Sequence, residues 1–421
     1  MFSLSCRYPS LLAAVLLALM SHSSVLGQES DSACNGDFVS LEAGVLTVKP
    51  VGDGESDTIN LQCAFDEATN KGFSSIRLVS GDYLLTDHIY VNEFFGSFSG
   101  VSMDKTSIET NANRIYLRSS KVEVSRMSLH SAPRINGAFF WIHPVEYDCS
   151  KRVVRTTFDR VRMQWIPESD EAYDPDNTFY IYQAPYWYCR DGALLGSLSV
   201  NRSQFSGADI GILVIGFGGG AKIDISNNTF WGGRALNLYG ERGNYDNPLN
   251  ANISFTGNTV TLVDGGSTAI LLGSTDYGIN SSTIHIARNR FIHDKVVFYP
   301  RESRLGGASI RVTHRMPPLL DDNYSMPITI VGNTFDRSAW LRNESTGEYY
   351  RVDKLVNVEG FNRGVISGNR FLCNFGEAVD VTGDSWAFSG NTLSACRRVE
   401  DGGPAIFELS GENNVEGGNT Y

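Results

Sequence analysis

The fold is decided by a stretch that reads Ile223-Asp224-Ile225-Ser226-Asn227-Asn228-Thr229-Phe230. Two apolar residues flank one polar residue, an Asn follows, and an apolar or aromatic residue stands two positions after that Asn. The phrase returns at steps of 30, 31, 44, 36, 22 and 28 residues, counted from Asn to Asn. Such a period is typical of a solenoid in which each repeat is one turn. The repeated residues are Asn228, Asn258, Asn289, Asn333, Asn369, Asn391 and Asn419.

A second alternating segment follows each phrase, as in Leu236-Asn237-Leu238 and Ile270-Leu271-Leu272. We expect two strands per turn with one buried face, and inserted loops where the step is longer. Beyond Gly72 the segments are short, β-branched and interrupted by Gly, Asn or Asp, so no helix is expected there. The prediction is an all-β, right-handed parallel β-helix, clearest over residues 196–421, because a β-propeller needs four strands per uniform blade.

The repeated Asn is predicted to be structural. In stacked turns its amide can bond to the backbone of its own bend and to the Asn residues of the turns before and after it. The six copies from Asn228 to Asn391 should therefore form a ladder along the solenoid, and they are not candidates for catalysis; the copy at Asn419 is degenerate.

A helix is predicted ahead of the repeats, over residues 57–70. We expect Asp57 to cap its start and Gly72 to end it. Such a helix can cover the open end of a β-solenoid, which otherwise exposes core residues and strand edges. The apolar residues on its one face are Leu61, Ala64, Phe65 and Ala68.

This N-terminal region resembles the cap of the pectate-lyase-like superfamily, in which a GDGxxDDT segment precedes a helix and a PxGxY strand. Here Gly52-Asp53-Gly54, Asp57-Thr58 and Ser80–Leu85 match that pattern. With the repeats, the resemblance covers about residues 45–421. It implies one parallel β-helix domain over residues 28–421 with its cap at 45–72. It does not specify an activity, since the superfamily includes polysaccharide lyases, hydrolases, epimerases and non-catalytic proteins.

The first 27 residues are predicted to be a signal peptide, because Arg7 precedes the apolar run Leu11–Met20 and small residues follow up to Gly27. The run is too short to cross a membrane, and no second one follows. We therefore expect a secreted protein without a membrane span. Six cysteines remain after cleavage, which favours three disulfides in an oxidising compartment. Pairing of neighbours gives Cys34–Cys63, Cys149–Cys189 and Cys373–Cys396, one of about 15 connectivities.

The chain has a net formal charge of −12, which loss of Arg7 makes −13, and it contains no basic block. It lacks the charge needed to neutralise phosphates, so nucleic acid is not an expected partner. We expect an elongated monomer. Asn-x-Ser/Thr sequons are glycan acceptors in a secreted eukaryotic chain, although they also arise by chance in a chain rich in these residues. They stand at Asn201, Asn227, Asn252, Asn280, Asn323 and Asn343.

Equivalent outward positions of successive turns form columns with a spacing of about 4.8 Å. In the second strand of each turn this column becomes polar and charged over its last four members. One step along the same strands stand His314 and Glu359. The predicted column is Leu213, Asn237, Leu271, Arg311, Asn357, Asp380 and Glu408.

Arg311, Asp380 and either Glu359 or Glu408 have the ingredients for uronide chemistry. A base removes the proton beside the sugar carboxylate, while a cation, Arg or Ca²⁺, neutralises the developing enolate. Two carboxylates at a suitable separation would instead support glycoside hydrolysis. A third interpretation is a solvated face whose surface ion pairs contribute only about 0–1 kcal/mol each.

A second candidate cluster is aromatic and lies upstream. Trp141, Tyr182 and Trp187 fall on neighbouring turns or their loops, where exposed ring faces can stack on sugars. With Asn357 and His314 they are the predicted substrate-binding residues. The alternative is that these aromatics pack a long loop held by Cys189.

Matches to the motifs of individual families are partial. Tyr173-Asp174-Pro175-Asp176-Asn177 is similar to the catalytic YxxDPH segment of alginate C5-epimerases, but Asp176 stands where that family has His. Arg315-Met316-Pro317 is similar to the RxP of pectate lyases without its second Arg. The paired Asp and GHG motifs of polygalacturonases are absent from the sequence.

The sequence therefore predicts a secreted protein that acts on an acidic, uronate-containing polysaccharide by lyase or C5-epimerase chemistry, with Ca²⁺ as a candidate cofactor. The alternative is a non-catalytic extracellular β-helix protein that binds glycans or builds a matrix. The net charge of −13 would repel a polyanion unless arginines or bound Ca²⁺ invert the local field.

Overall fold

The structure is a computed structural model of the whole chain. Several predicted features fall outside the residues that it describes: the signal peptide, the pair Cys149–Cys189, the segment 173–177, His314, Arg315, Trp187 and the sequons Asn280, Asn323 and Asn343. The described residues are 34, 36–110, 113–118, 120–131, 137–143, 153–165, 178–183, 195–207, 210–215, 221–239, 251–263, 268–273, 283–293, 308–313, 327–337, 354–373, 377–396 and 407–421.

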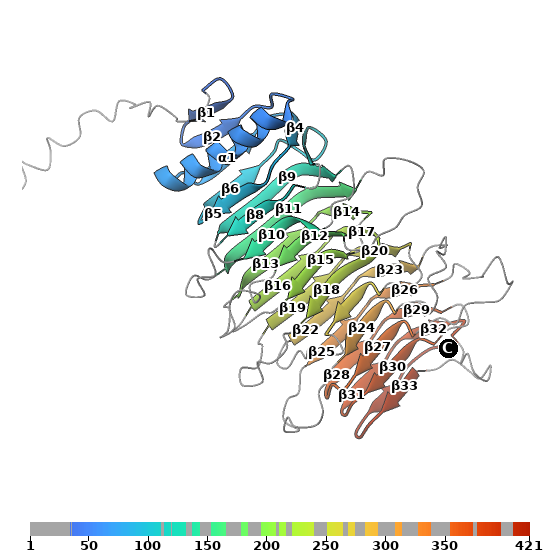
Figure 1. Cartoon of the computed structure of the whole chain (residues 1–421). Helices are drawn as coiled ribbons and strands as arrows, with labels where there is room; N and C mark the ends of the chain where they lie inside the picture. The colour runs from blue at the N-terminus through green and yellow to red at the C-terminus, as the bar shows by residue number, and fades with distance from the viewer. Residues whose placement is uncertain are drawn as a thin grey trace, which may run out of the picture.

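The chain winds into a right-handed parallel β-helix made of a 23-stranded sheet, here sheet A, and an 11-stranded sheet, here sheet B (Figure 1). Each turn contributes one strand to sheet B. Every strand pair is parallel except β1–β2, which is antiparallel. Sheet B consists of β5 (Ile89–Asn92), β8 (Ile115–Arg118), β10 (Gly137–His143), β12 (Thr178–Gln183), β15 (Ile210–Ile215), β18 (Arg234–Tyr239), β21 (Ile270–Leu272), β24 (Ile310–Thr313), β27 (Val356–Glu359), β30 (Val379–Thr382) and β33 (Phe407–Ser410).

Sheet A is bent into two rows, so a regular turn has three strands and the prediction of two was wrong. The repeated phrase itself spans two strands. The first row is β1 (Val39–Glu42), β2 (Val45–Val48), β3 (Ser75–Leu78), β6 (Phe95–Ser99), β9 (Lys121–Ser131), β11 (Val153–Trp165), β13 (Leu195–Asn201), β16 (Ala221–Ser226), β19 (Ala251–Thr256), β22 (Thr283–Ala287), β25 (Ile328–Val331), β28 (Gly364–Ser367), β31 (Trp386–Ser389) and β34 (Val415–Gly417). The second row, which β9 and β11 also reach, is β4 (Gly81–Leu85), β7 (Thr106–Thr110), β14 (Gln204–Ser206), β17 (Thr229–Gly232), β20 (Thr259–Leu262), β23 (Arg290–His293), β26 (Thr334–Asp336), β29 (Arg370–Leu372) and β32 (Thr392–Ser394).

The bend between the rows is made by one residue in the left-handed region, placed immediately before the repeated Asn. Here Gly257 and Gly332 have φ of 66° and 63°, and Asn227 has 57°. Side chains with a Cβ disfavour this conformation, which explains why Gly or Asn so often stands there. A residue in the left-handed region changes the direction of the chain. It therefore divides each repeated phrase into two strands, although the alternating pattern alone predicts one.

The predicted Asn ladder is present from Asn228 to Asn419. Each backbone N–H donates to the Oδ1 of the next Asn at 2.8–3.0 Å, and each Nδ2 donates to that same Oδ1 at 2.9–3.1 Å. The Nδ2 of each buried member also donates to a backbone carbonyl of the preceding turn at 2.8–3.0 Å, as Asn228 does to Val200. The ladder thus satisfies polar groups that the bend would otherwise leave unpaired inside the protein.

The core is a column of inward side chains that stack from turn to turn. Phe291, Phe335 and Phe371 pack face to face, with centroids 5.1 and 4.8 Å apart. One polar pair is buried where the second row turns towards sheet B: the Nε2 of His293 lies 2.8 Å from the Oγ of Ser309. Burial, and secondarily the nearby positive charge of Arg337, holds the pKa of His293 well below its usual value, so this imidazole is neutral at pH 7.

The helix α1 (Gly54–Lys71) covers the N-terminal end of the solenoid (Figure 1), as predicted. It ends at Gly72, whose φ is 74°. The predicted N-cap was wrong: Asp53 is the cap, because its side chain accepts the N–H of Ser56 at 2.7 Å. Asp57 is fully buried one turn later, where its carboxylate accepts backbone N–H groups from outside the helix.

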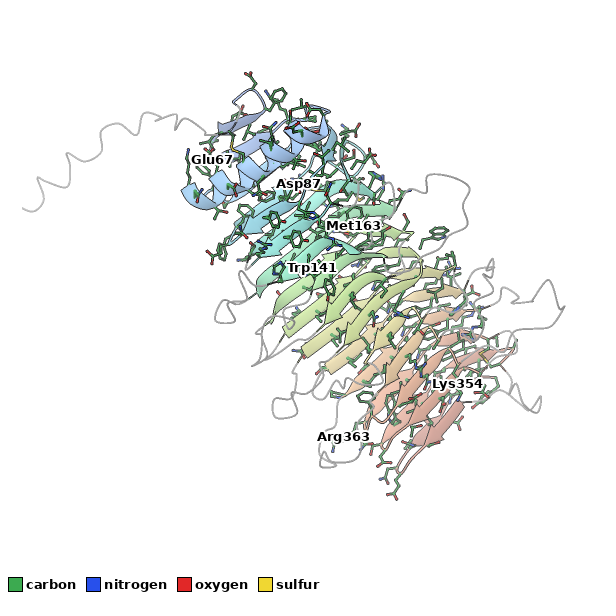
Figure 2. The ribbon with its side chains drawn as sticks, viewed as in Figure 1. Glu67, Asp87, Trp141, Met163, Lys354 and Arg363 are labelled. Carbon is green, nitrogen blue, oxygen red and sulfur yellow. A yellow bond between two sulfur atoms is a disulfide. The ribbon has the colours of Figure 1, made fainter. Side chains whose placement is uncertain are left out.

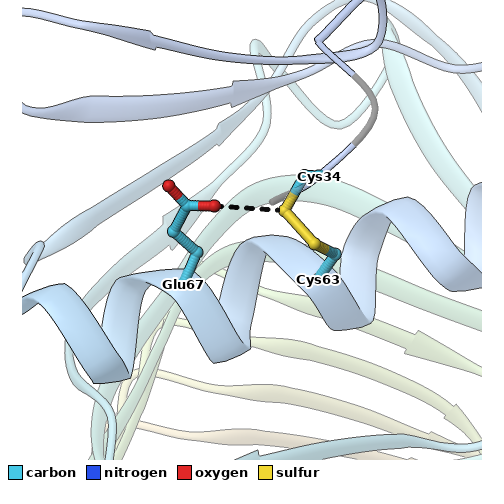
Figure 3. Close-up of side chains that lie close together, drawn as sticks. All are labelled: Cys34, Cys63 and Glu67. Carbon is cyan, nitrogen blue, oxygen red and sulfur yellow. Dashed lines mark hydrogen bonds between the residues drawn. A yellow bond between two sulfur atoms is a disulfide. The ribbon is translucent and has the colours of Figure 1, made fainter. Parts of the chain in front are cut away.

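Two of the predicted disulfides are present, Cys34–Cys63 and Cys373–Cys396. Cys34–Cys63 ties the chain before β1 to α1, and Cys373–Cys396 joins neighbouring turns of the solenoid. Figure 3 shows Glu67 of α1 beside the first disulfide, with Oε2 3.4 Å from the Sγ of Cys34. Within the described part of the chain, none of the helices is both long and apolar enough to span a membrane.

Candidate functional site

The candidate site is the outer face of sheet B, where the strand register aligns the two predicted clusters in one column. Trp141 and Tyr182 of the aromatic cluster are register partners, and so are Arg311 and Asn357 of the charged cluster. The two clusters are therefore opposite ends of one line, about 4.8 Å per strand along the solenoid. From the N-terminal end, the column reads Tyr90, Tyr116, Trp141, Tyr182, Leu213, Asn237, Leu271, Arg311, Asn357, Asp380 and Glu408.

The aromatic end is a stack of half-buried rings. Tyr90 and Tyr116 stack with centroids 5.0 Å apart and an interplanar angle of 11°, and Trp141 continues the stack 5.9 Å from Tyr116. Tyr182 then meets Trp141 edge to face at 4.8 Å. Because the rings cover one another's faces, they present mainly edges to solvent. The expectation that open ring faces stack on sugars is therefore wrong for the middle of the column.

Two guanidinium groups lie over these rings. The Cζ of Arg118 is 4.4 Å from the centroid of Tyr90 and 5.3 Å from that of Tyr116, and the Cζ of Arg114 is 5.1 Å from the Trp141 ring. The strands of sheet B from β5 to β21 contain no acidic residue at all. Acidic residues do stand directly beside β5, at Asp87 and Glu93, so the absence of acidic residues is confined to the strands themselves.

The cap helix positions the first strand of this face. The side chain of Gln62 in α1 accepts the backbone N–H of Tyr90 at 2.7 Å and donates to the carbonyl of Tyr90 at 2.9 Å. In the described part of the chain, strand β5 has no neighbouring strand on this side, so Gln62 replaces the backbone hydrogen bonds that such a strand would make. His88 accepts the N–H of Arg114 at 3.0 Å through Nδ1. Burial chiefly lowers the pKa of His88, which keeps that nitrogen available as an acceptor at neutral pH.

Several buried donor atoms at the aromatic end have no hydrogen-bond partner among the described residues, and the Nε1 of Trp141 and the Nε of Arg118 are two of them. A buried donor without an acceptor is unfavourable. Neither atom has solvent-accessible surface, so a ligand oxygen reaches either one only after a neighbouring side chain moves. Figure 2 labels Trp141 on this face in the N-terminal half of the solenoid and Lys354 near its C-terminal end.

The charged end contains two small networks. In the first, the Nη2 of Arg311 lies 3.8 Å from the Oε1 of Glu359, and the Nδ2 of Asn357 donates to that oxygen at 3.0 Å. Asn357 is buried although its register position faces outwards, and its Oδ1 has no hydrogen-bond partner in the described part of the chain. Arg311 and Glu359 remain partly exposed and accessible to a ligand.

In the second network, Lys354 forms an ion pair with Asp380 and lies 3.8 Å from the Oε2 of Glu377. The structure thus brings four predicted residues together: Arg311, Asn357, Glu359 and Asp380. Glu408 follows Asp380 in register, but its side chain is outside the described part, as are His314 and Trp187. One Asp380 oxygen is occupied by a cation that the sequence did not suggest, and a base at this position would compete with that ion pair.

The sequence-based prediction missed Tyr90, Tyr116, Arg114 and Arg118, which form half of the aromatic end. A signal was present, because Ile89-Tyr90-Val91 and Ile115-Tyr116-Leu117 show the same apolar-x-apolar pattern as the later strands of sheet B. These early turns lack the repeated Asn, so the sequence offered no marker of their register. Lys354 was missed because it precedes its strand by two residues.

One group of potential metal ligands occurs among the described residues: Cys34, Cys63 and Glu67. Since the two cysteines form a disulfide, their sulfurs are not thiolates and do not act as metal ligands. This group is therefore part of the cap's structure.

No protein-family model matches the chain, and no curated protein matches its sequence. Solved structures do match in fold. The Agl-KA catalytic domain superposes with a TM-score of 0.52 at 12% identity, over 94% of this chain and 69% of that one. A GH87 alpha-1,3-glucanase catalytic domain in complex with tetrasaccharides gives 0.45 at 10%, over 89% and 65%. PfbA, a surface adhesin of Streptococcus pneumoniae, gives 0.39 at 12%, over 88% and 91%.

The likeness to the Agl-KA catalytic domain shows the fold alone, which is a parallel β-helix. The chain spans about two thirds of the length of the Agl-KA and glucanase structures. At this level of identity, function has to be argued from the chain's own residues.

Proposed function

We propose that this protein is secreted and binds an acidic polysaccharide along the outer face of sheet B. The observation that carries the proposal is the column of stacked aromatic rings with Arg114 and Arg118 over them; the strands themselves contain no acidic residue, although Asp87 and Glu93 flank β5. Guanidinium groups bind carboxylates through charge-assisted, often bidentate hydrogen bonds. Ring edges and hydroxyls supply further polar contacts.

The geometry favours a linear polymer over a compact ligand. The column has a spacing of about 4.8 Å per turn and extends over the whole length of sheet B, with aromatic rings at regular intervals at one end and polar and charged groups at the other. A chain of sugars presents carboxylates and hydroxyls at regular intervals too. Arg114 and Arg118 also offset, at this end of the face, part of the repulsion between a polyanion and a chain with a net charge of −12.

Secretion is proposed from independent features. The predicted signal peptide and the two disulfides both fit an oxidising compartment. Among the sequons in the described part, Asn227 and Asn252 are exposed and Asn201 is partly exposed, so each is a candidate glycan acceptor. All three lie on sheet A, away from the proposed polysaccharide-binding face of sheet B.

Replacing Arg118 by Gln should weaken binding of polygalacturonate about ten-fold, because one charge-assisted hydrogen bond contributes about 1.5–3 kcal/mol and about 1.4 kcal/mol is a factor of ten. Tyr116→Phe, which removes only a hydroxyl, should have a smaller effect. Titration calorimetry measures the affinity, with neutral dextran as the comparison ligand. Arg370→Gln, on an exposed site of sheet A, is the matched control. Unchanged affinity in Arg118→Gln would contradict the proposal.

A second candidate function is chemistry on a uronate at the charged end. The observation in its favour is the buried Oδ1 of Asn357, an acceptor without a partner in the described part, in register between Arg311 and Asp380. Because this oxygen has no solvent-accessible surface, a sugar hydroxyl would donate to it only after a neighbouring side chain moved, and it would then lie beside the Arg311 cation and the Glu359 carboxylate. That arrangement suits removal of the proton next to a carboxylate, with Arg311 stabilising the enolate and Glu359 or Asp380 moving the proton or binding Ca²⁺.

Under this second proposal, Arg311→Ala and Asp380→Asn should each lower turnover of alginate or pectate at least about 100-fold, since each removes a group that acts in the transition state. Absorbance of the unsaturated product follows a lyase, and NMR follows an epimerase, both with and without Ca²⁺. Glu412→Gln, an exposed carboxylate near the C-terminus, should leave turnover unchanged. Wild-type protein that binds a uronide but converts none under either condition would restrict the function to binding.

A further inference from the structure

A column of arginines occupies the bend of sheet A in consecutive turns. The residue before each ladder position has φ between 50° and 66° throughout. In the later turns it is Gly or Asn, with one exception, Arg288. In three consecutive earlier turns it is Arg126, Arg160 and Arg202, which the strand register places directly above one another.

This choice of residue is unfavourable for the backbone. Glycine adopts the left-handed region freely, whereas a long side chain with a Cβ is strained there. Gly257, Gly332, Gly368, Gly390 and Gly418 show that glycine serves the same bend in five other turns. In three adjacent turns an arginine is kept at this position although its backbone is strained there. This indicates that the guanidinium group has a function besides forming the bend.

The surroundings of this column are strongly basic. Strands β9, β11, β13 and β14 with their connecting bends hold six cationic residues against two acidic ones, Glu123 and Asp159, so these segments have a formal charge of +4, which Asp104, the ion-pair partner of Arg162, lowers to +3. The whole chain has −12. The six cations are Lys121, Arg126, Arg155, Arg160, Arg162 and Arg202.

Internal ion pairs account for only part of this charge. Asp159 accepts from Arg202 at 2.8 and 2.7 Å and from Arg160 at 3.1 Å, so one carboxylate serves two guanidinium groups. Arg162 pairs with Asp104 at 2.9 Å. Arg126 is exposed, and no ion pair links it to another described residue. The column therefore keeps an excess of positive charge at the surface.

We propose that Arg126, Arg160 and Arg202 form a second polyanion-binding strip, separate from the face of sheet B, for a sulfated or carboxylated polysaccharide that runs along the solenoid axis. Their spacing of about 4.8 Å per turn presents one cation for each turn in a straight line. A single flexible chain with regular anionic groups fits a line one residue wide. The phenylalanines of these strands, Phe158 and Phe205, are buried, and an exposed ring next to the strip is that of Trp231, the register partner of Ser206.

The test uses glycine, which the bend accepts. In Arg126→Gly/Arg160→Gly, the midpoint of thermal unfolding should stay the same or rise, because the bend is relieved of strain. Affinity for heparin or polygalacturonate should fall at least ten-fold, and the slope of log affinity against log salt should become shallower. The matched control is Arg288→Gly, which relieves the same strain outside the basic patch and should leave affinity unchanged.

The sources of the anion are distinguished by the two probes, since heparin carries sulfates and polygalacturonate only carboxylates. The loss should also appear in an Arg118→Gln background, where the aromatic end of sheet B is impaired, so the two proposals can fail independently. An equal loss of affinity in Arg288→Gly, or no loss in the double variant, would overturn the proposal. Tighter binding of single-stranded DNA than of either polysaccharide would overturn it as well.

Discussion

Replacing Asn333 by Ala is expected to lower the free energy of unfolding by about 3–5 kcal/mol, a large effect for one small polar side chain. Its Oδ1 accepts the backbone N–H and the Nδ2 of Asn289, both at 2.9 Å, and its Nδ2 donates to the carbonyl of Ile286 at 3.0 Å. Alanine would leave these buried groups unpaired, and each unpaired group costs about 1–3 kcal/mol.

Urea denaturation followed by circular dichroism measures this change. An equal slope of unfolding free energy against urea concentration in the wild type and in Asn333→Ala is evidence that the folded state is otherwise intact. Thr329→Ala is the control, because Thr329 is an outward residue of β25, the strand of the same turn. It should change stability by less than about 0.5 kcal/mol. A loss for Asn333→Ala no greater than for Thr329→Ala would show that the ladder does not stabilise the fold.

Replacing Asp57 by Ala should cost about 3 kcal/mol or more and should loosen the cap. Its Oδ1 accepts the N–H of Val51 at 2.7 Å, and its Oδ2 accepts those of Gly52 at 3.3 Å and Leu84 at 3.0 Å. One buried carboxylate thereby joins the loop before α1, the helix and β4. Alanine removes the acceptor for three donors at once.

Asp53→Ala is the matched comparison, because Asp53 is the exposed N-cap and accepts one hydrogen bond from Ser56. Loss of an N-cap costs about 1 kcal/mol. Urea denaturation gives both values, and the rate of limited proteolysis within residues 45–72 reports on the cap itself. If Asp53→Ala were the more damaging change, the buried carboxylate would not be what holds the cap in place.

The cap also bears on function, because the first strand of the aromatic end is held by α1. Gln62 satisfies both backbone groups of Tyr90, which begins the column of rings. A solenoid would otherwise begin with an unpaired edge at this point. The proposed polysaccharide-binding face thus begins at β5, the strand that α1 covers. Its geometry therefore depends on the stability of the cap.

The periodic part of the sequence was sufficient to predict the fold and much of the register. The Asn phrase marks the same point of each turn, so residues at a fixed distance from it fall in one column. For this reason Arg311, Asn357, Asp380 and Glu408 were aligned correctly from the sequence alone. The pairing of neighbouring cysteines followed from the same local winding.

The earlier turns were not predictable in this way. They lack the repeated Asn, and their strands β9 and β11 run across the bend without a break. Without that marker the sequence did not show that Tyr90, Tyr116, Trp141 and Tyr182 share a column, or that their faces are covered by one another. Asp57 was predicted to be the N-cap of α1 but is a buried hydrogen-bond acceptor. An Asp side chain suits both roles, so the residue type alone did not distinguish them.

The sequence by itself determined the solenoid, its ladder and its N-terminal helix, because each depends on contacts within one turn or between equivalent positions of the next. Only the tertiary structure decided which chemistry meets on one surface. It joined aromatic and charged residues far apart in the chain into a single face, and it stacked Arg126, Arg160 and Arg202 on one bend. The physical reason is that a stack converts separations of 22 to 46 residues into steps of about 4.8 Å, but only once the register of every turn is known.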